Sequence, residues 1–142
     1  MTKTIKAPAD PHILPVRVYY EDTDAHGIVY HANYLKFAER GRTEYLRATG
    51  FDHHEIKEKY NLLLVIRHIE IDYLAPARLD DMIELCTKVL SRGRTSIVME
   101  QVFTRDGKTI AKMKVTVVGV TPEGKPLLLP PVLREGFQET RS

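Results

Sequence analysis

The sequence predicts an α+β fold in which a five-stranded antiparallel sheet wraps around one long helix. Apolar residues recur every three or four positions over residues 30–49 and at every second position over much of residues 63–121. A segment rich in Val and Tyr before the helix, residues 14–20, supplies the remaining strand. This order of strand, helix and then a run of strands is typical of an α+β domain.

The long helix is expected over residues 30–49, with one stripe of side chains facing the sheet. The stripe consists of Tyr34, Ala38, Gly41, Tyr45 and Ala48. Its small residues permit close approach of another element, so we expect this helix to be the central one. Gly50 is suited to end the helix, because glycine readily adopts the left-handed conformation of a C′ residue.

The other elements are expected to be shorter. Residues 51–59 predict a short helix or turn with Asp52 as its N-cap. The later strands are expected at residues 63–73, 82–90, 95–104 and 109–121. Asp106-Gly107 predicts the hairpin before the last strand. Pro15 is expected at the start of the first strand, where a missing N–H is tolerated.

Length and composition predict one globular domain. The chain has 142 residues, 43% of them hydrophobic, and we expect a flexible lead-in at 1–13, the domain at 14–134 and a polar tail at 135–142. A net charge of +2 argues against a nucleic-acid partner, which favours a strongly basic patch, but suits a small anionic ligand. No apolar run approaches the roughly 20 residues that span a bilayer, and no apolar segment of a secretory signal is expected at the N-terminus.

The single cysteine, Cys86, cannot form an internal disulfide, which favours a reducing compartment and a cytoplasmic location. Cys86 lies in an alternating strand segment, where a small buried hydrophobic residue is the simplest interpretation. A catalytic thiol would need a base nearby, and the sequence shows none beside it.

One polar run, residues 20–34, concentrates the groups that can carry chemistry. Asp24 lies in the loop before the long helix, where a carboxylate can act as nucleophile or as general base for water. The alternative for Asp24 is an Asx turn or an N-cap without catalysis. Glu21 and Asp22 have the same alternative, as turn or solvated carboxylates.

Gly27 and the expected helix start complete this loop. Gly27 permits a positive φ and close approach of a ligand, although it can also be an ordinary turn glycine. The backbone N–H groups of residues 30–33 are expected to lack helical partners and can polarise a carbonyl oxygen. His31 can reach a substrate or remain a first-turn histidine. A metal site involving His26 and His31 is not expected, because their spacing fits no usual zinc arrangement.

The run Tyr20-x-Asp22-Thr23-Asp24-x-x-Gly27-x-Val29-Tyr30-His31-Ala32-Asn33-Tyr34 resembles the signature of the 4-hydroxybenzoyl-CoA thioesterase family of hotdog-fold proteins. A second matching segment runs from Tyr73 to Asp81, so the resemblance covers roughly residues 14–132. Within the family, the chain is most similar to the YbgC-type acyl-CoA thioesterases associated with the Tol-Pal system. The resemblance implies a hotdog fold: a five-stranded antiparallel sheet around a long helix, paired into dimers or tetramers.

The resemblance also implies roles for particular residues. Asp24 is the catalytic carboxylate, the backbone N–H of His31 is the donor to the thioester carbonyl, and the side chains of Tyr20 and His31 line the pocket. The expected substrate and coenzyme A contacts are Gly27, Val29, Tyr30, Arg92, Arg94, Ser96 and Lys125. Glu39 is a rival carboxylate, because another branch of hotdog thioesterases uses a helix carboxylate. The Asp24 motif is intact here, so Glu39 is expected to be a structural or interface residue. His26 stands where glycine is common, which leaves the acyl preference open.

The resemblance favours an acyl-CoA thioesterase that needs neither metal nor cofactor and releases a free acid and coenzyme A. The runner-up is a non-catalytic hotdog module that binds acyl-CoA or an acyl carrier protein in an envelope or lipid complex. A hotdog dehydratase is a weaker third option, because such enzymes rely on a histidine with a helix carboxylate. Expected partners are the acyl-CoA, a second or further copies of the chain, and in some settings an acyl carrier protein or a membrane surface.

Overall fold

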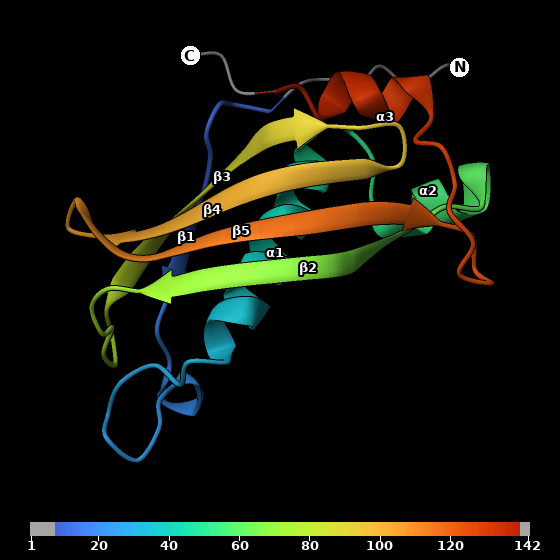
Figure 1. The fold of residues 1–142 in the computed structure, drawn as a ribbon. Helices are drawn as coiled ribbons and strands as arrows, with labels where there is room; N and C mark the ends of the chain where they lie inside the picture. Colours follow the sequence, from blue (N-terminus) through green and yellow to red (C-terminus); the bar gives the residue numbers. More distant parts are fainter. Residues whose placement is uncertain (1–7, 140–142) are drawn as a thin grey trace.

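The computed structural model describes residues 8–139, which form one five-stranded antiparallel sheet wrapped around a long helix (Figure 1). The strands follow the order β1-β3-β4-β5-β2 across the sheet. Their bounds are His12–Arg17 (β1), Leu63–Tyr73 (β2), Met82–Arg92 (β3), Ser96–Arg105 (β4) and Lys108–Val120 (β5). The helices are η1 (Tyr20–Asp22), α1 (Asn33–Ala48), α2 (His53–Tyr60) and α3 (Pro131–Gly136). The predicted fold class is confirmed.

Helix α1 packs closely on one face of the sheet. A Cβ atom at Gly41 would lie 2.6 Å from Leu85 Cδ2 and 2.9 Å from Gln101 Nε2, so glycine permits this approach. The predicted stripe is buried at four of its five positions, whereas Ala48 is exposed. Ala48 belongs to the last turn of α1.

A buried glutamine joins α1 to the sheet. Gln101 of β4 is 0% exposed, and its Nε2 donates to the Ala38 carbonyl (2.9 Å) and to Thr87 Oγ1 (3.1 Å). Its Oε1 accepts a hydrogen bond from Arg42 Nη1 at 2.9 Å. Buried polar groups are costly unless paired, so this network favours one seating of α1 on the sheet.

The first strand differs from its prediction. β1 begins at His12, so Pro15 lies inside the strand, paired with Glu84, rather than at its start. This is possible because β1 is an edge strand, where a missing N–H need not break a ladder. Tyr20 lies in the short helix η1 instead of the strand.

The predicted turns and caps fit the structure closely. The Asp52 side chain accepts a hydrogen bond from Glu55 N (2.8 Å) and caps α2, and Gly50 follows α1 with φ of +102°. Asp106 and Gly107 both have positive φ, as a type I′ hairpin requires. α1 begins at Asn33 rather than at residue 30, because residues 28–32 form bridges and a turn instead of the first helical turn.

The C-terminal segment stays packed against the rest of the fold beyond residue 134, where the domain is expected to end. The sequence pattern does not predict helix α3. Phe137, which follows this helix, is 3% exposed and stacks on Tyr45, with ring centroids 5.3 Å apart. Of the expected tail, residues 140–142 lie outside the described residues. Of the expected lead-in, residues 1–7 also lie outside them, and His12 and Ile13 already belong to β1.

Candidate active site

Asp24 occupies a tight turn between η1 and α1. Its Oδ1 accepts hydrogen bonds from the backbone N–H groups of His26 (2.8 Å) and Ile28 (3.4 Å), and Asp24 N donates to the Ile28 carbonyl at 2.8 Å. This is the geometry of an Asx turn. Oδ2 has no hydrogen-bond partner among residues 8–139, and the side chain is 26% exposed. One oxygen therefore orients the carboxylate while the other is available for chemistry.

The turn before α1 leaves two backbone donors free. Of the expected donors, Tyr30 N binds the Asp22 carbonyl (2.9 Å) and Asn33 N binds the Tyr30 carbonyl (2.8 Å). The N–H groups of His31 and Ala32 donate to no acceptor within the described part of the chain. They lie at the positive end of the α1 dipole, where they can stabilise a developing oxyanion.

Asp24 and His31 line the same open cleft, of about 410 Å³. The remaining walls come from Ile28 and Val29 of the turn, Tyr34 of α1 and the segment from Tyr73 to Pro76. The Tyr73 hydroxyl donates to the His31 carbonyl at 2.7 Å, which ties the end of β2 to the turn before α1. The Asp24 carboxylate and His31, whose N–H is free, thus share one cleft with mostly apolar walls.

Tyr34 contributes a polar edge to this cleft. The residue is 3% exposed and contacts Tyr73 edge-to-face, with ring centroids 5.4 Å apart. Burial raises the pKa of its hydroxyl, Tyr73 raises it further, and a hydrogen bond with the Ala77 backbone opposes the shift. The Tyr34 hydroxyl therefore stays protonated at neutral pH.

The other motif residues divide between the cleft and the surface. Val29 lines the cleft and is 4% exposed. Gly27 has φ of +78° with open space around its Cβ position, so backbone conformation is what requires glycine there. Tyr30 is half-exposed and packs on the His31 ring, with centroids 4.5 Å apart. Tyr20 is 82% exposed and is not among the residues that line the cleft.

The four residues expected to contact coenzyme A from the strand turns lie far from Asp24 in the same chain. Arg92 ends β3, Ser96 begins β4 and Arg94 lies in the connection between them, while Lys125 follows β5. Both segments are at the opposite end of the sheet from the loop between η1 and α1 (Figure 1). Arg92 donates to the backbone carbonyls of Arg134 and Phe137, so it also fastens α3.

A second cavity, of about 210 Å³, lies at that opposite end. Its polar walls include Glu39 and Arg42 of α1 and His53 of α2, and its apolar walls include Leu64 and Ile66 of β2. Burial lowers the pKa of His53, so the imidazole is mostly neutral at neutral pH. Glu39, the rival carboxylate, lines this cavity and not the cleft of Asp24.

Residues 8–139 contain no group of three or more His, Cys, Asp and Glu side chains that could hold a metal. Cys86 is a partly buried residue of β3, and burial raises the pKa of its thiol, as expected of a structural cysteine. Within the same described range, no helix combines the length and apolar character needed to cross a membrane.

Sequence reasoning did not assign the cleft residues of the second segment. Tyr73, Ala75 and Pro76 line the cleft, and Tyr34 joins them from α1. In the sequence, the segment from Tyr73 to Asp81 supports the resemblance but does not by itself predict that these residues line the cleft. Its contact with the Asp24 turn is long-range and could not be inferred from spacing.

The fold and the site together define a member of a known class. The profile of the thioesterase-like superfamily matches residues 18–137. The structure of a probable thioesterase from Bartonella henselae superposes with a TM-score of 0.82, at 37% identity, covering 84% of this chain and 99% of the other. The structure of BH1999 gentisyl-coenzyme A thioesterase gives a TM-score of 0.80 at 25% identity, covering 86% and 98% of the two chains.

The chain therefore belongs to the thioesterase-like superfamily of hotdog-fold proteins. More particularly, it is a homologue of the acyl-CoA thioesterase YbgC of Haemophilus influenzae, with 41% identity over 128 residues, or 89% of this chain and 94% of the relative. The predicted class, a thioesterase of the hotdog type, is confirmed.

Proposed function

We propose that this protein hydrolyses an acyl-CoA to a free carboxylic acid and coenzyme A, and that Asp24 carries the reaction. The observation that supports this most directly is the state of the carboxylate in this cleft-lining residue: Oδ1 is held by two backbone donors, while Oδ2 has no hydrogen-bond partner among residues 8–139. The YbgC protein of Haemophilus influenzae, named an acyl-CoA thioesterase, supports the substrate class.

The chemistry has two routes that share the same geometry. As general base, Asp24 takes a proton from water, the hydroxide adds to the thioester carbonyl, and the C–S bond breaks to release the thiolate. As nucleophile, Oδ2 attacks the carbonyl and expels the thiolate, and water then hydrolyses the resulting anhydride. In both routes the N–H group of His31, a cleft-lining residue, would bind the carbonyl oxygen as it becomes negative.

The free edge of β2 supports assembly into a two-fold dimer. β2 ends the sheet, extends over eleven residues and exposes Val65 (38%) and Ile66 (42%). Uncovered edges of this kind tend to pair with another strand. Two-fold pairing of β2 with its copy is antiparallel and continues the sheet into the partner.

Such a dimer would bring distant segments to the cleft. Antiparallel pairing sets the Asp24 end of one sheet beside the far end of its partner. Arg94, Ser96 and Lys125 would then approach the partner's cleft, where basic groups suit the phosphates of coenzyme A. The cavity with Leu64 and Ile66 would adjoin the same cleft and could receive part of the acyl group. Further pairing into tetramers would use the sheet face that carries no helix in Figure 1.

The decisive experiment compares Asp24→Asn with the parent protein on short aliphatic, long aliphatic and aromatic acyl-CoA substrates. Asparagine keeps an oxygen for the Asx turn but cannot act as base or anionic nucleophile. We expect kcat to fall about 10²- to 10⁴-fold with binding and melting temperature retained. Glu21→Gln is the matched control, because Glu21 is an exposed carboxylate near the same loop and should leave kcat unchanged.

Equal rates for Asp24→Asn and the parent would refute the role of Asp24. A parent protein that binds acyl-CoA or acylated acyl carrier protein without turning it over would favour the non-catalytic module instead.

A further inference from the structure

The loop between β2 and β3, residues 74–81, is the surface on which the Asp24 turn is fastened. Val29 N donates to the Ala77 carbonyl at 2.8 Å, and Ile28 forms an antiparallel bridge with Arg78. The turn itself is closed by a bridge between Thr23 and Val29. Any displacement of residues 76–78 is therefore transmitted to the segment that carries Asp24.

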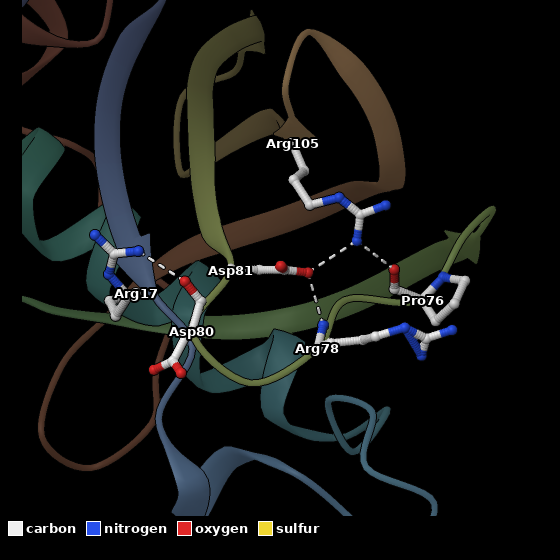
Figure 2. Close-up of polar contacts among 6 residues, drawn as sticks. All are labelled: Arg17, Pro76, Arg78, Asp80, Asp81 and Arg105. Atoms are coloured by element: carbon white, nitrogen blue, oxygen red, sulfur yellow. Dashed lines mark hydrogen bonds and ion pairs between the residues drawn. The ribbon is translucent and has the colours of Figure 1, made fainter.

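The Arg105 guanidinium holds this loop from the end of β4, while Arg17 Nη1 of β1 donates to the Asp80 carbonyl at its other side. Arg105 Nη1 donates to the Pro76 carbonyl at 2.7 Å and to Asp81 Oδ2 at 2.9 Å. The same Oδ2 accepts a hydrogen bond from the Arg78 backbone N–H at 2.8 Å. Figure 2 shows Arg105 reaching both sides of the loop at once, with Asp81 at the centre of the contacts.

Burial and charge give this contact more effect than an exposed ion pair. The side chains of Arg105 and Asp81 are each 27% exposed, so water competes only in part. Both hydrogen bonds of Arg105 involve a charged donor, and such bonds are stronger than neutral ones. The loop is also tied to the sheet, since Leu74 N and Ala75 N both donate to the Ile110 carbonyl. Arg105 thus completes a loop fastened along its length.

We propose that Arg105 is a positioning residue for the reaction: through the Pro76 carbonyl and Asp81 it holds residues 76–78 against Val29, and so sets the position of Asp24 in the cleft. This inference rests on the catalytic role proposed for Asp24. Arg105 is not among the residues that line the cleft, so its contacts with the site pass through the loop.

A neighbouring arginine provides a contrast within the same loop. The Arg78 guanidinium makes no hydrogen bond or ion pair among the described residues, and in Figure 2 it points away from Asp81. Only its backbone takes part in the contacts of the loop: the N–H donates to Asp81 Oδ2, and the carbonyl accepts from Asp81 N. Arg78→Met therefore changes the same residue type in the same region without touching the contacts of Arg105.

The test measures amide exchange of Val29 together with steady-state kinetics in Arg105→Met, Arg105→Lys and Arg78→Met. We expect Arg105→Met to lower protection of the Val29 N–H at least tenfold, while core amides such as Met113 keep theirs. A carboxylate displaced by about 1 Å can cost roughly 100-fold, so kcat should fall about 10- to 100-fold with KM within about twofold. Arg105→Lys should recover part of both effects, and Arg78→Met should show neither.

The outcomes separate this inference from the proposed function. Parental Val29 protection and parental kcat in Arg105→Met would overturn the positioning role while leaving Asp24 catalysis intact. Inactive parent protein would overturn the function, and kcat reduced without a change at Val29 would overturn the route through the loop. If Arg105→Met does not fold, Asp81→Asn takes its place with a smaller expected effect in the same direction, because asparagine still accepts a bond from the Arg78 N–H.

Discussion

The buried network around Gln101 offers a sharp test of how α1 is seated. Gln101→Leu removes three hydrogen bonds at once: those to the Ala38 carbonyl, to Thr87 Oγ1 and from Arg42 Nη1. Leucine is similar in bulk, so the main loss is polar. Ala38 keeps its place in the helical ladder, whereas Thr87, which is 0% exposed, retains a hydroxyl that water cannot reach.

The magnitude follows from these contacts. An unpaired buried hydroxyl costs about 1–3 kcal/mol, and the lost bond to half-buried Arg42 costs about 1 kcal/mol more. Gln101→Leu should therefore destabilise the fold by roughly 2–4 kcal/mol. For a domain of this size, that lowers the melting temperature by roughly 5–12 °C. Adding Thr87→Val removes the stranded hydroxyl, so the double variant should recover about 1–2 kcal/mol.

Urea unfolding of the parent, both single variants and the double variant measures this coupling directly. Gln138→Leu, at an exposed glutamine, is the control and should shift stability by less than about 0.5 kcal/mol. Strict additivity of the two substitutions would refute the network, since it would mean that Gln101 and Thr87 stabilise the fold independently.

Three further predictions follow from the edge strand, the cleft and the core. Ile66→Lys sets a charge on the exposed edge of β2, and sedimentation should show a shift from dimer to monomer with loss of activity; a parental oligomer would contradict pairing through β2. Tyr73→Phe removes the hydrogen bond to the His31 carbonyl, and kcat/KM should fall about 2- to 10-fold; an unchanged value would mean that this bond does not orient the donors. Burial raises the pKa of Tyr45 to about 12 from 10.0, so its stabilising effect is complete below pH 10 and is lost as pH rises towards 12. Tyr45→Phe should flatten that alkaline loss in urea unfolding, and an equally steep loss would assign it to another group.

Much of the fold could be predicted because its signals are local. The bounds of β2 agree with the alternation of residues 63–73, and Asp52 and Gly50 occupy their expected cap positions. Helix α3 was missed because its six residues offer no period, and it is held by Phe137 stacking on Tyr45 rather than by propensity.

The candidate site likewise contains residues that the sequence predicts and residues that only the fold brings together. The polar run drew attention to Asp24 and His31, and the structure brings both into one cleft. Tyr20, in the same run, belongs to η1, is 82% exposed and is not among the residues that line the cleft. Arg105 could not have been selected from the sequence, since its contact with Pro76 spans 29 residues.

The amino-acid sequence is enough to predict the order of elements, the caps and turns, and the segment that holds the candidate carboxylate. These features depend on side-chain period and on backbone preferences of a few neighbouring residues. The tertiary structure is needed to show which backbone N–H groups stay free, which residues form the cleft around Asp24, and that Arg105 binds the loop behind it. Those facts depend on strand register and packing between distant segments, and no local spacing encodes them.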